Sequence, residues 1–196
     1  MSPIRAVLPR RTPPARATST ALAGTCLAAL CLLSGAADAT QVVVGSVAVL
    51  PPGALHVNTL LAVPWASLEP GSQVLIAPGR YTGPMMVNSQ GSATQPVVIK
   101  PYDPAQPPTL ATSVDFQGAG YVKLVGVTVE DSPWGAVVIR RGSHHITLRG
   151  NTLRRSYVGV DISDGAGTGL RIVNNLIEDH QTHGIAIVEV NATAAD

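Results

Sequence analysis

Aromatic side chains are scarce in this chain, which has two Trp, four Tyr and one Phe among its 196 residues. A core built on stacked rings is therefore excluded, and Val, Ile and Leu must fill the interior. Charged residues make up only 13% of the sequence, and the formal net charge is +1. Because no strong basic field exists, no nucleic-acid partner is expected.

Cysteine is equally rare, and both copies, Cys26 and Cys31, lie within residues 1–39. This segment has the layout of an export signal: a basic start, an apolar run from Ala21 to Ala37, and a small-residue cleavage site that ends at Ala39. A retained membrane anchor is the alternative, although the run is short and rich in Ala and Gly. Cleavage would leave a secreted or periplasmic chain of net charge −2 with no cysteine, so disulfide bonds cannot stabilise it.

The second half of the sequence also lacks a helical period and instead repeats every 24 residues. Three successive copies begin at Tyr121, His145 and Gly169. Apolar residues fall at matching positions of the copies, with a one-residue slip in the third copy: Val122, Ile146 and Leu170; Leu124, Leu148 and Ile172; Val129, Leu153 and Ile177; Ala136, Val160 and Ile185; Val138, Ile162 and Ile187. A fixed period of this size indicates a solenoid.

Within each copy apolar and polar residues alternate, as in Val122-Lys123-Leu124, which is typical of strands with one buried face. Gly, Asn and Asp separate these strands and suit sharp corners. Each copy is therefore predicted to form one coil of a parallel β-helix, about 4.8 Å from the next coil. The period extends back to residue 72, which predicts about five coils of roughly 24 residues.

Three parts of the chain follow from these patterns: an export signal over residues 1–39, an N-terminal segment over 40–71, and a β-helix domain over 72–196. The N-terminal segment is the expected cap, since the first coil of a solenoid must be covered. A buried strand is predicted over 185–190, with only a short tail after it. Either self-association through the last coil covers this strand, or the chain is the front part of a longer β-helix, truncated at its C-terminus.

Two phrases in the sequence resemble the opening coils of secreted right-handed parallel β-helix proteins: PWASLEPGSQVLIAPGRY from Pro64 to Tyr81, and GSATQPVVI from Gly91 to Ile99. The resemblance covers residues 64 to about 188 and is to pectate-lyase-like proteins, many of them polysaccharide lyases. It implies an all-β, single-stranded, right-handed parallel β-helix and an exported protein. It does not fix a reaction, because lyases, epimerases and hydrolases share the first phrase.

The chemistry that the resemblance implies is action on an acidic (uronic-acid) polysaccharide, by lyase-type β-elimination or by C5 epimerisation. Both reactions begin with removal of the same C5 proton, so one site could perform either. A non-catalytic glycan-binding or cell-surface solenoid is the rival hypothesis. An inactive fragment of a longer enzyme is the third.

Charged pairs recur at one position of the repeat, as Glu130-Asp131, Arg154-Arg155 and Glu178-Asp179. They predict an acid–base–acid column with neighbours one strand spacing apart. On a uronic-acid polymer, Arg154 and Arg155 would act in catalysis by neutralising the sugar carboxylate. Glu130, Glu178 and Asp179 would hold a cation, with Ca²⁺ as the cofactor. The alternative is a salt-bridge ladder that only keeps like charges from stacking.

The segment from Ser156 to Val190 resembles the catalytic coil of the mannuronan C5-epimerases, in which G-x-D-P-H-D is followed a coil later by H-G-I. Asp161, Asp164 and His183 match this pattern, whereas Ile162 and Ser163 replace its Pro and His. The resemblance implies substrate binding by Asp161 and a catalytic general base in His183, whose imidazole titrates near neutrality. A solvent-facing turn histidine is the alternative.

Trp134 and Tyr157 fall in the turns of adjacent coils and are predicted to bind substrate, because exposed rings stack on sugar faces. A hydrophobic lid under a loop is the alternative. Corner asparagines, Asn151, Asn174 and Asn175, are explained by side chains that satisfy backbone groups. The pair His144 and His145 lacks a third ligand at a diagnostic spacing, so no zinc site is expected.

Overall fold

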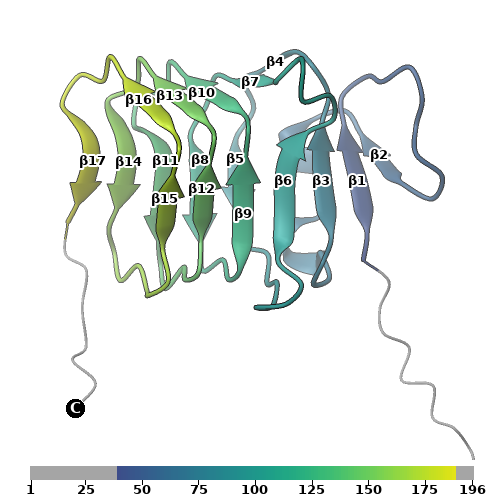
Figure 1. The fold of residues 1–196 in the computed structure, drawn as a ribbon, viewed down its shortest axis with the longest axis horizontal. Coiled ribbons are helices and arrows are strands. Elements are labelled where there is room, and N and C mark those ends of the chain that lie inside the picture. The colour runs from purple at the N-terminus through teal and green to yellow at the C-terminus, as the bar shows by residue number, and fades with distance from the viewer. Residues whose placement is uncertain (1–38, 189–196) are drawn as a thin grey trace, which may run out of the picture. The chain divides into compact units, whose positions relative to one another are not determined.

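The structure is a computed structural model that describes residues 39–188, so nearly all of the predicted export signal lies outside the described residues. Within this range the chain is almost entirely β-structure, arranged as a stack of coils (Figure 1). Each coil contributes one strand to each of three sheets, and every strand pair is parallel. No helix in these residues is both long and apolar enough to span a membrane.

Five coils of three strands are present, as the repeat predicts. They comprise β3 (Gln73–Ile76), β4 (Arg80–Tyr81) and β5 (Met85–Val87); β6 (Val97–Pro101), β7 (Thr109–Leu110) and β8 (Val114–Gln117); β9 (Val122–Val125), β10 (Thr128–Glu130) and β11 (Gly135–Arg140); β12 (Thr147–Arg149), β13 (Thr152–Arg154) and β14 (Val158–Ile162); and β15 (Arg171–Val173), β16 (Leu176–Glu178) and β17 (His183–Ile187). The first sheet has the order β15-β12-β9-β6-β3-β1-β2, the second β16-β13-β10-β7-β4, and the third β17-β14-β11-β8-β5.

The N-terminal segment joins the first sheet as well as covering an end of the stack. Strand β1 (Gln41–Val44) pairs in parallel with β3, and β2 (Leu55–Val57) pairs with β1. Two 3-10 turns follow, η1 (Leu60–Ala62) and η2 (Trp65–Ser67). The buried Trp65 donates its ring N–H to the Leu60 carbonyl at 3.1 Å. The segment therefore extends the sheet by two strands and closes the core with one indole ring.

Aliphatic columns run through the interior where the sequence period predicts them. Leu124, Leu148 and Ile172 are in register across the first sheet, and Val129, Leu153 and Ile177 across the second. These columns belong to one continuous core, which also contains the fully buried Phe116. Such burial is the main stabilising term for residues 39–188, which contain no cysteine.

In the third sheet the predicted pairing is wrong by one residue. Val160 lies beside Val137 rather than Ala136, and Ile162 lies beside Ile139 rather than Val138. The reason is the length of the corner: four residues connect β10 to β11, but only three, 155–157, connect β13 to β14. The slip therefore belongs to the second copy of the repeat rather than the third, because Val137 and Ile185 are 48 residues apart, and Val138 faces outward.

Polar side chains fill the corner between the first and second sheets. Asn151 accepts a hydrogen bond from the Val127 N–H at 3.1 Å and donates to the Leu124 carbonyl at 3.0 Å. One coil later, Asn175 accepts from the Asn151 N–H at 2.9 Å and donates to the Leu148 carbonyl. The predicted role of corner asparagines is confirmed for these two residues. Asn174 instead has a positive φ of 54° and an exposed side chain.

Candidate functional site

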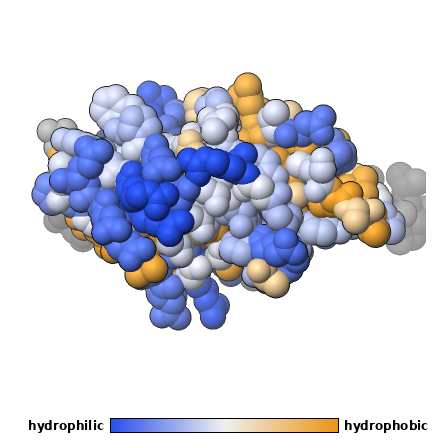
Figure 2. Space-filling view, turned by 90° about the horizontal axis from the view of Figure 1, so that it is seen from above, coloured by the Kyte–Doolittle hydropathy of each residue, from blue (hydrophilic) through white to orange (hydrophobic). Residues whose placement is uncertain are grey.

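The charged pairs of the repeat meet on the second sheet, in the register that the sequence predicts. Glu130, Arg154 and Glu178 are Cα partners on β10, β13 and β16. Arg154 donates from Nε to Glu130 at 2.9 Å, and Arg155 lies 2.7 Å from the same carboxylate and 2.9 Å from Asp131. Figure 2 looks onto this side of the molecule and shows a strongly hydrophilic surface over the later coils.

A third arginine, which the sequence interpretation missed, completes this cluster. Arg80 on β4 reaches across β7 to pair with Glu130 and lies 2.8 Å from Asp131. Arg80 and Thr109 are register partners although 29 positions separate them, whereas later coils repeat every 24 residues. The longer early coil hides Arg80 from an alignment by fixed period. The only sequence signal is that Arg80 directly precedes Tyr81 at the end of the PGRY phrase.

Three guanidinium groups keep the two carboxylates ionised. Burial of Glu130 by itself raises its pKa, but hydrogen bonds from Arg154 and Arg80 and the charge of Arg155 outweigh it, so the net pKa is lowered. The pKa of Asp131 is also lowered, by hydrogen bonds from Arg155 and Arg80. The carboxylates in turn raise the pKa of Arg80 and Arg155. The cluster is thus a base–acid–base clamp that reaches across four coils, with residues from the first, third and fourth.

This geometry changes the interpretation of the column. Glu130 is only 5% exposed, and both of its oxygens contact arginines. Arg154 and Glu178 are register partners, as the acid–base–acid column predicts, but in residues 39–188 no ion pair connects Arg154 or Arg155 to Glu178 or Asp179. Nor do the described residues contain a group of three His, Cys, Asp or Glu side chains placed to hold a metal ion. Glu130, Glu178 and Asp179 therefore do not form the predicted Ca²⁺ site in this structure.

The residues that match the epimerase pattern are not brought together. Asp161 pairs in register with Ala186, whereas His183 pairs with Val158. Asp161 and His183 are therefore offset by three positions along the strand direction, a distance of about 10 Å. Asp164 lies beyond the end of β14, at a positive φ of 48°, and its nearest cation is Arg141 at 3.8 Å. His183 opens strand β17 rather than lying in a turn, is exposed, and has no side-chain hydrogen bond among the described residues.

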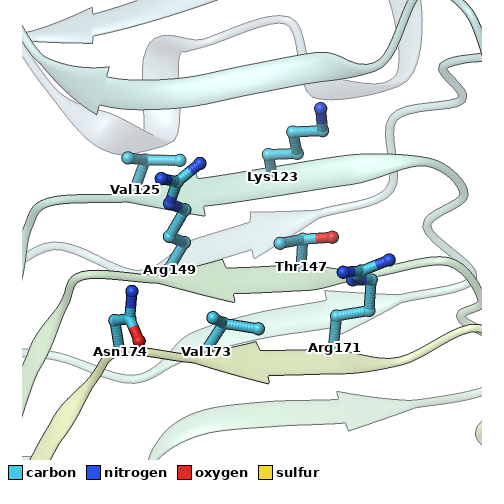
Figure 3. A pocket seen from close by; sticks show the side chains of 7 residues that line it. All are labelled: Lys123, Val125, Thr147, Arg149, Arg171, Val173 and Asn174. Atoms are coloured by element: carbon cyan, nitrogen blue, oxygen red, sulfur yellow. The ribbon is translucent and has the colours of Figure 1, made fainter.

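The outer face of the first sheet carries a set of cations that the sequence interpretation did not single out. Lys123, Thr147 and Arg171 are register partners on β9, β12 and β15, and Arg149 projects from β12 two positions after Thr147. Together with Val125, Val173 and Asn174 these four residues line a hollow of about 510 Å³. Figure 3 shows the long side chains rising from three neighbouring strands toward the same side.

The basic face, which we define as Lys100, Lys123, Arg149 and Arg171, contains no acidic partner. Strands β6, β9, β12 and β15, which carry these four residues, have no Asp or Glu. No ion pair in residues 39–188 involves any of the four, whereas Arg80, Arg140, Arg141, Arg154 and Arg155 are all paired. A signal was present in the sequence: cations occupy alternate, outward positions of four successive coils.

The predicted sugar-stacking residues lie on the side of the third sheet. Trp134 is 72% exposed and Tyr157 is 45% exposed, so neither ring is buried as a lid under a loop. Trp134 and Asp161 line a common hollow of about 330 Å³ with Asp115 and Arg140. Tyr157 shares the corner of residues 155–157 with Arg155, and Trp134 lies in the corner between β10 and β11, whereas Asp161 lies on β14 of the third sheet.

The rings of Tyr121, His144 and His145 gather at the corner before the first sheet. Tyr121 and His145 stack with their centroids 4.3 Å apart, and the Nδ1 atoms of the two histidines are 3.0 Å apart. Tyr121 and His145 both have positive φ angles, near 53°, at the first position of the repeat. Stacking in successive coils accounts for this cluster without a ligand.

Comparison with known proteins places the fold. No protein-family model and no curated protein sequence matches this chain. Among solved structures it is similar to an alginate lyase from Paenibacillus sp. str. FPU-7, with a TM-score of 0.55 and 18% sequence identity. The match covers 69% of this chain and 44% of the lyase chain, so it spans less than half of that enzyme. The chain therefore has a parallel β solenoid fold like that of a polysaccharide lyase.

Proposed function

We propose that this protein is an exported, right-handed, single-stranded parallel β-helix that binds an acidic (uronic-acid) polysaccharide on its basic face and cleaves it by β-elimination. The observation that carries the proposal is the row of four cations with no carboxylate on the same strands. The fold likeness to an alginate lyase agrees with it. The resemblance of the opening coils to exported proteins supports the location.

The spacing of the basic face suits a polymer that carries a negative charge on each sugar. Lys123 and Arg171 are separated by two strand spacings, about 10 Å, and Arg149 lies between them on β12. Arginine binds a carboxylate with two parallel hydrogen bonds, which fixes the sugar ring as well as neutralising it. The hollow of about 510 Å³ lies among these side chains, on the outer face of the first sheet.

Elimination requires that the charge of the uronate be neutralised before its C5 proton can leave. Arg149 and Arg171 would bind the carboxylate and stabilise the negative charge that develops when the proton departs. Among the seven residues that line the hollow, we assign the removal of this proton to the side-chain nitrogen of Lys123. The C4–O bond then breaks, a C4–C5 double bond forms, and the leaving oxygen takes a proton from water.

The experiment combines turnover and binding on defined polyuronates. Incubation with alginate, pectate and glycosaminoglycans, followed by absorbance of the unsaturated product and by NMR of C5 inversion, distinguishes elimination from epimerisation. We expect elimination in the wild type and none in Lys123→Ala, with binding retained. Arg149→Gln should weaken binding about tenfold, while Arg141→Gln, which removes a charge from outside the basic face, should leave it unchanged.

A non-catalytic glycan-binding solenoid is the second candidate. It is favoured by the composition of the hollow, whose lining contains no His, Asp, Glu, Cys or Tyr to act as a general base. Binding that depends on Arg149, with no product from any polyuronate, would establish this candidate. If polyuronate binding is unchanged when Arg149 and Arg171 are both substituted, the lyase and the glycan-binding candidates are both contradicted.

A further inference from the structure

We propose a second binding site, on the outer face of the third sheet, for neutral sugar residues of a glycan chain, with Trp134 as the stacking surface. The site is the third-sheet groove, which we define as Ser113, Asp115, Trp134, Val138, Arg140 and Asp161. It shares no residue with the basic face and does not depend on the reaction proposed for that face.

The aromatic ring of Trp134 is exposed to solvent and borders a hollow in the surface. Its 72% exposure contrasts with the 6% exposure of Trp65. The ring borders the hollow of about 330 Å³ in the third-sheet groove, and also a neighbouring hollow of about 260 Å³ lined by the half-exposed Met86. An apolar ring beside an open trough is suited to the C–H face of a pyranose, which is the apolar side of a sugar.

The backbone that carries Trp134 is fixed on both sides before any ligand arrives. The Trp134 N–H donates to the Ser132 hydroxyl at 3.3 Å, and its carbonyl accepts from the Tyr157 N–H at 3.0 Å. The next carbonyl, of Gly135, accepts from the hydroxyls of Ser113 at 2.8 Å and Ser132 at 3.1 Å. A platform fixed in this way loses little backbone freedom when it binds.

The polar residues of the groove favour hydroxyl groups over carboxylates. Arg140 donates to both oxygens of Asp115, at 3.1 and 2.6 Å, so its charge is already neutralised. Asp161, across from Val138 in the sheet, makes no side-chain hydrogen bond or ion pair within residues 39–188. Its carboxylate can accept hydrogen bonds from sugar hydroxyls but repels a uronate. The net charge of the third-sheet groove is therefore opposite in sign to that of the basic face.

Tryptophan fluorescence reports on this site directly, because the described residues contain one buried and one exposed indole. The probes are mannohexaose, cellohexaose and xylohexaose, each titrated into the full chain. We expect at least one of them to change the emission, with an affinity that Trp134→Ala lowers about tenfold in calorimetry. Asp161→Asn should lower it less. Arg149→Gln, on the basic face, should leave it unchanged.

Two results would overturn the proposal: no response to any of the three oligosaccharides, or binding that survives Trp134→Ala. Failure of the third-sheet groove can be distinguished from failure of the basic face. Oligouronate binding should persist in Trp134→Ala and weaken in Arg149→Gln. Oligouronate binding that is lost in Trp134→Ala would show a single shared site and would also contradict a separate groove.

Discussion

Asn151 occupies a buried corner where the backbone of three coils would otherwise lack hydrogen-bond partners. Its side chain accepts from Val127, donates to Leu124, and also donates to Asn175 at 3.0 Å. Removing it leaves a buried N–H and a buried carbonyl unsatisfied. We expect Asn151→Ala to lower the free energy of unfolding by about 2–3 kcal/mol. Denaturant titration measures this, with Asn174→Gly at the exposed neighbour as the control near zero.

Glu130 should govern the acid sensitivity of the fold. Its pKa is lower in the folded chain than in the unfolded one, so its stabilising effect is complete above the unfolded value of about 4.3 and is lost as the pH falls through the folded value. Glu130→Gln should therefore destabilise the protein at pH 7, by about 2 kcal/mol, and flatten the loss of stability below pH 4. An unchanged acid profile would show that the clamp contributes nothing.

At the scale of a single coil, the corners on both sides of the second sheet place a residue in the left-handed conformation in the last three coils. Positive φ angles recur at matching repeat positions, for example at Gly126, Gly150 and Asn174, and at Asp131, Arg155 and Asp179. Gly150 has φ of 64° with open space around it, so Gly150→Ala meets only the backbone cost, about 1 kcal/mol of unfolding free energy. Gly83→Ala, with equal space and no positive φ, should be neutral in the same denaturant titration. Equal effects would contradict the corner argument.

The strands and their inward columns could be predicted from sequence because burial imposes a period of two within each strand and 24 between coils. The third-sheet register could not be predicted, because Ala136 and Val137 are both apolar and either could pair with Val160. The corner that is one residue shorter decides between them. Arg80 was not predictable either, since its partners depend on the length of an irregular early coil. The outward cations were visible at Lys123 and Arg171, but alternation marks an exposed residue without indicating a ligand.

For the whole molecule, the last coil leaves aliphatic side chains exposed. Ile185 and Ile187 are 45% and 67% exposed, whereas their register partners Val160 and Ile162 are buried. In residues 39–188 no strand pairs with the outer edge of β17, which lies at the end of the stack (Figure 1). We propose that two copies associate through this face, since unpaired edges and apolar surface favour such contact.

Sedimentation velocity at several concentrations tests this association. The mass should rise with concentration in the wild type, and Ile187→Lys should shift it toward the monomer by placing a charge in the contact. A wild-type chain that stays monomeric at all concentrations would contradict self-association through this coil.

The central claim is that the basic face recognises the carboxylates of a polyuronate. The most direct measurement is calorimetric titration of an oligouronate and of its carboxyl-reduced, neutral counterpart into the Trp134→Ala variant, which removes the proposed neutral-sugar site. The account predicts that the oligouronate binds, that binding weakens as salt screens the charges, and that the reduced oligomer does not bind. Equal affinity for the two oligomers would contradict it.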